Sequence, residues 1–299
     1  MFPIEKENPV RIITYTASPE DAGLKVQTFL QRRGYSVRLL RSLKQRAGAV
    51  LCNGAAVRMI DRLAPGDELT VSMEDAAVTE EAPTELRVPV VYEDDDLIVY
   101  NKPPFLATHP SNGHRAGTLA GVYTRDMRER GEATAVFRPV FRLDRDTDGL
   151  CVCAKTSYAA ARLAGKVEKV YAAVACGDLP KEGCIDAPIV QLEPHRMRRG
   201  VREDGQRAVT HYRRLAGNGR FTLAEVRLET GRTHQIRVHF AYAGHPLAGD
   251  SLYGTGDDSG LDRQALSCVK VSFLHPVHGN PVHLCINIHD EFLKLVQSE

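Results

Sequence analysis

The chain has 299 residues, of which 43% are hydrophobic and 26% charged, and its formal net charge is +1. This is the composition of a globular protein with room for about two domains, and it argues against a disordered chain. No apolar run approaches the ~20 residues of a membrane span, and the N-terminus lacks the apolar region of a secretory signal, so we expect a cytoplasmic protein.

Residues 23–73 are predicted to form a small helical module. Two stretches carry apolar residues near helical spacing, and Ser36 can cap the second of them. The expected apolar stripe of that second helix is Val37, Leu40 and Leu43.

Asn53-Gly54, between two short apolar runs, predicts a β-hairpin, and a further strand is expected after the turn at Pro65-Gly66. We assign residues 1–76 to this module. Residues 77–87 are acidic and contain a proline, so we interpret them as a linker.

Positive charge is concentrated in two stretches although the net charge is small. Residues 25–47 hold seven lysines and arginines and no acidic residue, and residues 195–214 hold seven arginines against Glu203 and Asp204. Such stretches can bind a polyanion locally. They can equally be solvated surface, and the charge pattern leaves both interpretations open.

Residues 88–299 predict an α+β domain built on an extended mixed or antiparallel sheet. Strands are expected at 96–102, 149–155, 169–176, 208–215, 220–229, 236–240 and 282–288. Helices are expected at 117–131, 156–166 and 290–298.

The seven cysteines are scattered and form no C-x-x-C pair. We therefore interpret them as buried reduced thiols rather than zinc ligands or disulfides.

Three alternating aspartates, Asp144, Asp146 and Asp148, precede Gly149. They resemble the first half of a calcium loop, but the position that should hold a bidentate glutamate is Lys155, which disfavours calcium. A two-aspartate phosphohydrolase would need a buried apolar strand before the first acid. The chain instead has Arg138, Pro139 and Arg142 there, so this alternative stays open as a minor one.

Residues 228–240 predict a turn at Gly231 followed by a strand. On that strand Arg237 would lie opposite the face of Ile236 and Val238. A buried arginine there needs a carboxylate partner. Asp144 is the candidate, and the pair would hold one charged aspartate in place without a metal.

At this point three motifs come together: RLDRDTDGL (142–150), KVYAAVACG (169–177) and GRTHQIRVH (231–239). In this order they resemble the RluA-type family of RNA pseudouridine synthases over about residues 88–299. NKP near residue 101, RQAL (263–266) and FLHP (273–276) resemble further blocks of the family. The resemblance implies the family's catalytic fold and the isomerisation of uridine to pseudouridine in RNA, with no metal and no organic cofactor.

The resemblance also implies roles for single residues. Asp144 matches the essential carboxylate, acting either as nucleophile or by taking a proton from the sugar. Tyr171 matches the tyrosine that stacks on the target base, although its pattern also fits a core tyrosine. Arg237 matches the arginine that pairs with the aspartate.

Arg142 matches a residue that enters the space left by a flipped base, and a phosphate contact is the alternative. Other residues expected to contact RNA near this site are Arg145, Arg232 and His234.

Two residues depart from the family pattern: Phe141 stands where histidine is usual, and Asp148 where serine or threonine is usual. We expect Asp146 and Asp148 to shape the loop through backbone N–H groups. We also expect Asp148 to add negative charge near the RNA.

The order helix, basic helix, hairpin and strand in residues 23–73 resembles the S4 RNA-binding module. This implies that Arg38, Arg41, Lys44 and Arg46 face RNA. The alternative is a small helical cap on the larger domain.

Together these features predict an RNA pseudouridine synthase that acts on structured RNA, ribosomal RNA more than transfer RNA. We expect a monomer with no obligate protein partner and no membrane contact. The alternatives are an RNA-binding assembly factor without catalysis and, third, a metal-dependent phosphohydrolase.

Overall fold

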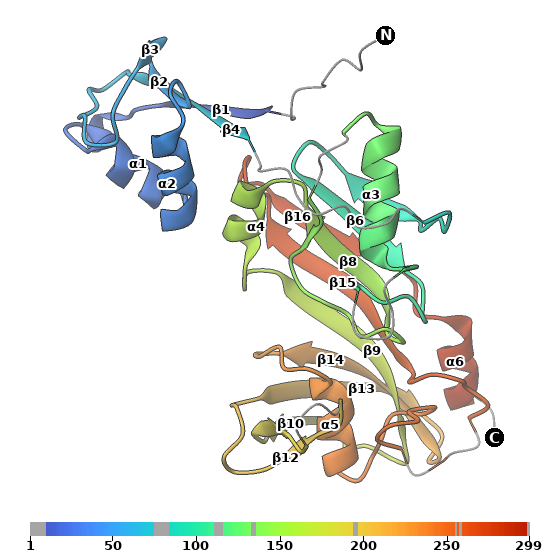
Figure 1. Ribbon diagram of the computed structural model, residues 1–299. Helices are drawn as coiled ribbons and strands as arrows, with labels where there is room; N and C mark the ends of the chain where they lie inside the picture. Colours follow the sequence, from blue (N-terminus) through green and yellow to red (C-terminus); the bar gives the residue numbers. More distant parts are fainter. Residues whose placement is uncertain are drawn as a thin grey trace.

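The structure is a computed structural model that describes residues 10–74, 84–110, 116–132, 136–193, 197–254, 256 and 259–297 (Figure 1). The elements up to residue 74 are β1 (Val10–Thr16), a 3-10 turn (Pro19–Asp21), α1 (Val26–Arg32), α2 (Val37–Gln45), β2 (Val50–Cys52), β3 (Ala55–Ala56) and β4 (Glu68–Glu74). They are followed by β5 (Val90–Glu93), β6 (Leu97–Lys102), α3 (Leu119–Glu129), β7 (Arg138–Pro139), β8 (Asp148–Ala154), α4 (Ser157–Leu163), β9 (Glu168–Cys176), β10 (Glu182–Asp186), β11 (Ile189–Gln191), β12 (Arg199–Val201), β13 (Val209–Gly217), β14 (Phe221–Leu228), α5 (Gln235–Tyr242), β15 (Leu266–Leu274), β16 (Pro281–Cys285) and α6 (Asp290–Gln297). The predicted linker, residues 77–87, lies outside the described residues as far as residue 83.

The N-terminal module packs α1 and α2 against a sheet of order β1-β4-β2-β3. The predicted helices and hairpin are confirmed: the Ser36 hydroxyl accepts the Leu39 N–H at 3.2 Å. Asn53 and Gly54 have positive φ values of 50° and 80°, as a two-residue hairpin turn of this kind requires. Strand β1, which residues 23–73 leave out, pairs along its whole length with β4.

The prediction for the apolar face of α2 was wrong at one position. Val37 is 67% exposed, and the buried stripe is Leu39, Leu40 and Leu43. Val37 is the first residue of the helix and lies outside the stripe that packs on the sheet.

The second sheet runs in the order β10-β13-β14-β9-β15-β8-β6-β5, with β16 added on β15 and β7 on β8. Its β15–β8 pair is parallel and its other pairs are antiparallel, so the predicted mixed α+β sheet is confirmed. Strand β15, in the middle of the order, was not predicted from the sequence. Polar Ser267, Lys270 and Ser272 interrupt its apolar pattern.

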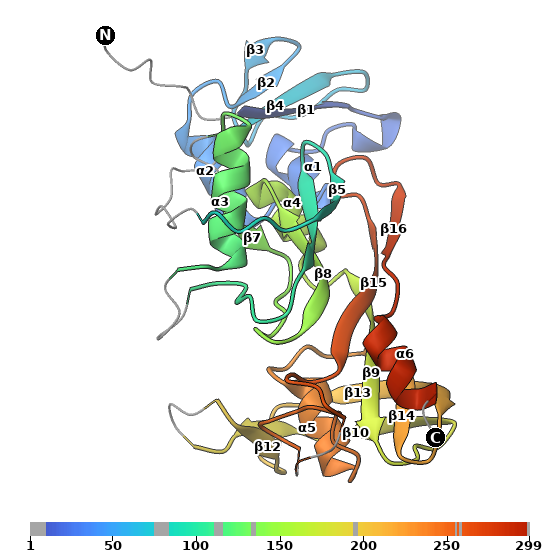
Figure 2. The same ribbon diagram turned by 90° about the vertical axis from the view of Figure 1, so that its right-hand side faces the viewer.

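Helices α5 and α6 cover opposite faces of β9. Ala173 shares a cluster with Phe240 of α5, whereas Ala172 and Val174 share one with Phe292 of α6. Successive strand residues point to opposite faces, so this alternation places the two helices on either side (Figure 2). Tyr171, two residues from Ala173, therefore points to the α5 side.

The predicted strand at 236–240 is wrong, because these residues belong to helix α5. Every residue from Gln235 to Phe240 is buried, so the helix has no exposed polar face. The sequence therefore lacks the apolar–polar pattern of 3.6 residues that would indicate a helix. Gln235 fixes the helix start, since its amide oxygen accepts from the Arg232 N–H at 3.0 Å and the Thr230 hydroxyl at 2.9 Å. These local hydrogen bonds stabilise the start of the helix, and the alternating pattern of IRVHF gives no sign of them.

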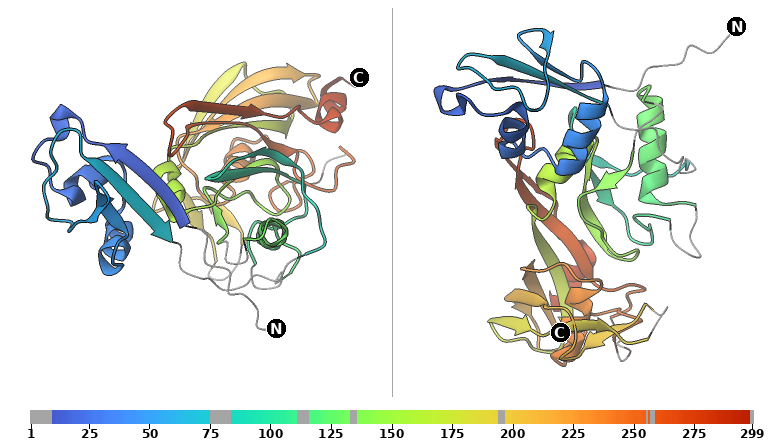
Figure 3. Two further views of the ribbon diagram at one scale, coloured as in Figure 1. Left: turned by 90° about the horizontal axis from the view of Figure 1, so that it is seen from above. Right: turned by 60° about the vertical axis from the view of Figure 1, so that its left-hand side comes forward.

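The N-terminal module contacts the rest of the chain beside α4 (Figure 3). Arg11 of β1 donates to both carboxylate oxygens of Asp96, at 2.9 and 2.8 Å. Tyr158 of α4 donates to the Arg33 carbonyl at 3.0 Å and packs on Tyr35.

The cysteine prediction is right in part. Cys151, Cys153 and Cys268 are buried, but Cys184 and Cys285 are exposed, because they lie on solvent-facing positions of β10 and β16. In the described parts of the chain, no helix is long and apolar enough to cross a membrane.

Candidate active site

The loop between β7 and β8 carries Asp144 and is held by three hydrogen bonds. The Thr147 N–H donates to the Asp144 carbonyl at 3.2 Å, which closes a turn. Before it, the Thr108 hydroxyl donates to the Leu143 carbonyl at 2.9 Å. After it, Gln264 donates to the Thr147 hydroxyl at 3.1 Å. The backbone that carries Asp144 is therefore fixed from both sides.

Lys102 is fully buried under this loop. Its ammonium donates to the carbonyls of Pro103, Leu106 and Arg145 at 3.0, 2.8 and 3.0 Å. Burial lowers the pKa of Lys102 to about 8. The Lys102 side chain thus fixes the position of the Arg145 carbonyl, next to Asp144.

Gly149 lets β8 approach β15 closely. Its φ is +105°, and a Cβ atom there would lie 2.4 Å from the Cys268 carbonyl oxygen. Any side chain at this position would push the two strands apart, and with them the end of the Asp144 loop.

The expected role of Asp148 is wrong. Asp148 is 2% exposed, and its carboxylate pairs with Arg263, 3.5 Å away, and with His289. Its charge is therefore compensated inside the protein and is not presented to RNA. Asp146 also differs from the expectation, because it pairs with its neighbour Arg145, with Nε 2.6 Å from Oδ1.

We expect His289→Gln to lower the melting temperature more at about pH 6 than at about pH 9. Hydrogen bonding to Asp148 raises the pKa of His289 above its ordinary value. A raised pKa in the folded state gives stability that is complete below the ordinary pKa and is lost as the pH rises through the folded value. Arg263, which lowers the pKa, and Glu291, which raises it, are the other charged groups that face this histidine.

Melting curves of the variant and wild type across this pH range test the prediction. His283→Gln, an exposed histidine on β16, is the matched control. An equal loss at every pH for His289→Gln would show that the pair does not titrate in this range.

The side chains of Asp144, Tyr171 and Arg237 meet at a small cavity of about 60 Å³. The cavity is lined by Arg142, Leu143, Asp144, Thr147, Tyr171, Leu228, Arg232, His234, Gln235, Ile236, Arg237 and Leu266. The structure thus brings together residues from β9, β14, β15, α5 and two loops that lie far apart in the sequence.

Arg237 is buried and takes its main partner from outside the predicted pair. Its Nε and Nη2 donate to the two oxygens of Asp250, both at 2.8 Å, whereas its Nη1 lies 3.6 Å from Asp144 Oδ2. The predicted pair of Arg237 and Asp144 is present, but Asp144 is not the main partner of this arginine. Two carboxylates share one guanidinium, and Asp250 takes the bidentate contact.

Asp250 is a residue beside the cavity that was not predicted from the sequence, and it binds Arg237. Burial opposes its ionisation, but the hydrogen bonds and charge of Arg237 outweigh burial and lower the pKa of Asp250. The stretch GDSLYG offered a signal, because an acid between buried segments must find a cation.

Tyr171 lies on β9 between β14 and β15 and is 6% exposed. Burial raises the pKa of Tyr171 well above its ordinary value, with smaller effects from Cys268 and Asp144. Its hydroxyl is therefore protonated at neutral pH and can donate a hydrogen bond at the cavity.

His234 is buried beside Asp144. Its Nε2 lies 3.9 Å from Asp144 Oδ2, and its Nδ1 lies 2.8 Å from the Tyr253 hydroxyl. Burial lowers the pKa of His234, with Asp144 acting in the opposite direction, so the ring is neutral at pH 7.

The other residues predicted to contact RNA lie at several places. Arg142 and Arg232 are exposed and line the cavity. Arg145 is exposed beside it and paired with Asp146. On α2, the predicted residues Arg38, Arg41 and Lys44 are exposed to solvent.

Arg46 differs from these three residues of α2. Its guanidinium binds the Ser72 carbonyl and lies 3.2 Å from Glu74 Oε2. Its contacts therefore tie the end of α2 to β4 within the module.

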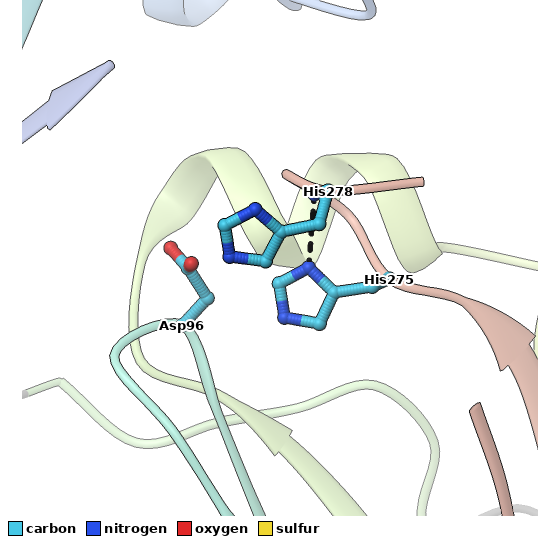
Figure 4. Close-up of side chains that lie close together, drawn as sticks. All are labelled: Asp96, His275 and His278. Atoms are coloured by element: carbon cyan, nitrogen blue, oxygen red, sulfur yellow. Dashed lines mark hydrogen bonds between the residues drawn. The ribbon is translucent and has the colours of Figure 1, made fainter. Parts of the chain in front are cut away.

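Asp96, His275 and His278 form a cluster with the composition of a metal site (Figure 4). The ligand atoms of His275 and Asp96 already have partners, however. The His275 Nδ1 accepts the N–H groups of Val277 and His278 at 3.2 and 3.1 Å, so its Nε2 donates to Asp94, 2.9 Å away. Asp96 is chelated by Arg11. A metal ion would have to displace these bonds, and the cluster instead joins the N-terminal module to the sheet.

Comparisons with known proteins point to one family. The family model for RNA pseudouridylate synthase matches residues 96–242, which contain Asp144, Tyr171 and Arg237. The RNA pseudouridine synthase YjbO of Bacillus subtilis (strain 168), described as uncharacterized, is 36% identical over 283 residues, or 92% of this chain and 99% of that protein. The chain belongs to the RluA-type family of RNA pseudouridine synthases.

A second relative of this RluA-type synthase carries a more specific name. Ribosomal large subunit pseudouridine synthase D of Xanthomonas campestris pv. campestris is 37% identical over 274 residues, covering 85% of this chain and 82% of that protein.

Solved structures share the fold of this RluA-type synthase at lower identity. Human RNA pseudouridylate synthase domain containing 1 aligns with a TM-score of 0.55 at 23% identity, over 67% of this chain and 83% of that one. Human RNA pseudouridylate synthase domain containing 4 aligns with a TM-score of 0.56 at 22% identity, over 69% and 90%.

Proposed function

We propose that this RluA-type synthase converts uridine to pseudouridine in ribosomal RNA with Asp144 as its catalytic carboxylate. The observation that carries this proposal is the cavity where Asp144, Arg237 and Tyr171 meet. Asp144 is 27% exposed there, so a substrate can reach its carboxylate, whereas Arg237 beneath it is 8% exposed.

The reaction breaks the N1–C1′ glycosidic bond and joins C5 to C1′. The uracil turns in the cavity between these steps, the C5 proton leaves and N1 gains a proton. Asp144 serves either as nucleophile at C1′ or as the base that takes a sugar proton. In both routes the charge of Arg237 steadies the carboxylate.

Tyr171 is proposed to stack on the target base and to donate its hydroxyl proton. Its raised pKa suits a donor rather than a base at neutral pH. No metal or organic cofactor is needed for any of these steps.

The target nucleotide has to leave its stack to reach Asp144, at a cost of a few kcal/mol. Arg142 is exposed at the cavity, and its planar guanidinium can stack where the base was. Arg145, Arg232 and His234 complete the polar rim that we propose for the flipped nucleotide.

We propose that the N-terminal module is an S4-like unit that binds RNA through α2. Its exposed residues Arg38, Arg41 and Lys44 share the solvent side of that helix, opposite the buried Leu39, Leu40 and Leu43. The boundaries proposed for the parts of the chain are 1–76, 77–87 and 88–299.

Replacing Arg38, Arg41 and Lys44 together by alanine is expected to weaken RNA binding. The rate of pseudouridine formation in the bound complex should not change. Each lost phosphate contact should reduce the slope of log K against log salt by about 0.7–0.9. Filter binding over a salt series measures this slope. Arg58→Ala, an exposed arginine of the same module paired with Asp61, is the control. An unchanged slope in the triple variant would contradict RNA binding by α2.

Ribosomal RNA is proposed as the target because relatives similar over most of the chain carry the name ribosomal large subunit pseudouridine synthase D. We further propose that the protein works in the cytoplasm as a monomer.

Pseudouridine mapping of total RNA tests the proposal. RNA from the source cell is compared with RNA from cells that lack the gene, complemented by wild type or by Asp144→Ala. Loss of one or more ribosomal sites that only wild type restores is the expected result. If Asp144→Ala restores the sites, the role of Asp144 is wrong. If no site changes, the RNA-binding assembly factor becomes the better interpretation.

A further inference from the structure

His234 is hydrogen-bonded to Tyr253 and lies beside Asp144. The Tyr253 hydroxyl lies 2.8 Å from His234 Nδ1, and the two rings pack edge to face at 5.7 Å. On its other side, the His234 Nε2 is 3.9 Å from Asp144 Oδ2.

The backbone of Arg199 decides the direction of these bonds. Its N–H donates to the Tyr253 oxygen at 2.9 Å. The oxygen therefore accepts a hydrogen bond from the Arg199 N–H, and the hydroxyl donates its own hydrogen bond to His234 Nδ1. Burial raises the pKa of Tyr253, so the hydroxyl keeps this proton at neutral pH.

The tautomer of His234 follows from this direction. A neutral imidazole that accepts at Nδ1 carries its proton on Nε2. Nε2 is the nitrogen that faces Asp144, so the ring presents an N–H donor to the carboxylate. The separation of 3.9 Å is longer than a hydrogen bond, and contacts between catalytic groups often tighten when the substrate binds.

We propose that Tyr253 is a positioning residue that fixes His234 as a neutral Nε2–H donor to the catalytic carboxylate. The inference rests on the proposed function of Asp144. His234 Nε2 and Arg237 Nη1 both face Oδ2, at 3.9 and 3.6 Å. This leaves Oδ1 as the oxygen available for the attack on C1′ or for the sugar proton.

The backbone conformation of His234 also supports a role for its ring at the site. Its φ of +57° and ψ of 20° are left-handed, a conformation that is unfavourable for a residue with a Cβ atom. That conformation places His234 at the start of α5, where the ring reaches Tyr253 and Asp144 at once. Arg237, one turn further along α5, lies with its Cζ 5.1 Å from the centre of the Tyr253 ring.

We expect Tyr253→Phe to lower kcat about 10–100-fold, the usual effect of losing a partner that orients a functional histidine. RNA affinity should stay unchanged, because the hydroxyl is directed at His234 and not at solvent. The assay is tritium release from 5-³H-uridine in a transcript of the RNA region found by mapping. Tyr242→Phe, a 64% exposed tyrosine on α5, is the matched control.

Two further measurements separate positioning from a packing role. Nitrogen-15 spectra of the imidazole should show protonated Nε2 in wild type and a shift of the tautomer balance in Tyr253→Phe. His234→Gln keeps an N–H donor near the place of Nε2, so it should retain more activity than His234→Leu. Both substitutions carry the same left-handed backbone, which matches their conformational cost.

The inference is overturned if His234 carries its proton on Nδ1, or if Tyr253→Phe keeps the wild-type kcat. It is also overturned if His234→Gln is as inactive as His234→Leu. Asp144→Asn is assayed alongside. If that variant turns over normally, the proposed function itself fails, and the positioning claim fails with it. If it is inactive while Tyr253→Phe is normal, only the positioning claim fails.

Discussion

Asp144→Asn is expected to lower kcat by about 10⁴-fold or more while leaving RNA binding and melting temperature close to wild type. The amide is nearly the same size as the carboxylate but can neither attack C1′ nor take a proton. The fold should tolerate it, because Arg237 keeps its bidentate partner Asp250 at 2.8 Å. Single-turnover tritium release with saturating enzyme measures the chemical step directly.

Asp146→Asn is the control in the same loop. Asp146 pairs with Arg145 at the surface and is expected to matter little for the chemical step. A metal-dependent hydrolase would need both aspartates, so it would lose activity in both variants and require magnesium. Equal losses in the two variants, together with that requirement, would overturn the single-carboxylate mechanism.

Asp250→Asn is expected to lower the free energy of unfolding by about 3–5 kcal/mol and to abolish activity. It leaves the Arg237 guanidinium buried, with side-chain exposure of 8%, without its bidentate partner. The nearest other carboxylate is Asp144, whose Oδ2 is 3.6 Å from Nη1, so Arg237 should turn toward it and occupy the reactive group. Urea unfolding followed by circular dichroism measures the loss.

A double variant, Arg237→Met with Asp250→Leu, keeps this prediction testable if the single variant does not fold. Removing both charges should recover most of the stability, because neither partner is left buried and unpaired. Activity should not return. Asp178→Asn, which removes a 60% exposed partner of Arg214, is the control and should change stability by under about 1 kcal/mol. A loss under about 1 kcal/mol in Asp250→Asn itself would contradict the role given to the pair.

Features that depend on neighbouring residues could be predicted from the sequence. The cap at Ser36 and the turn at Asn53-Gly54 both followed from local chemistry, since a hydroxyl satisfies a free N–H and a hairpin turn needs positive φ. The candidate residues Asp144 and Tyr171 were also named from the chain, because they stand in recognisable motifs. These motifs do not show what surrounds each side chain.

Features that depend on distant partners were decided by the tertiary structure. Alternation in residues 236–240 indicated a strand, yet burial on all sides and the bonds of Gln235 make a helix. The carboxylate that balances Arg237 is 13 residues further along the chain, and only the packing of that loop on α5 brings it within 2.8 Å. Asp148 likewise finds its cations in Arg263 and His289, more than a hundred residues away. A charged residue can be located from the sequence, but its partner depends on which elements pack together. A buried charge must be paired, and the partner can come from any part of the chain that the fold brings close.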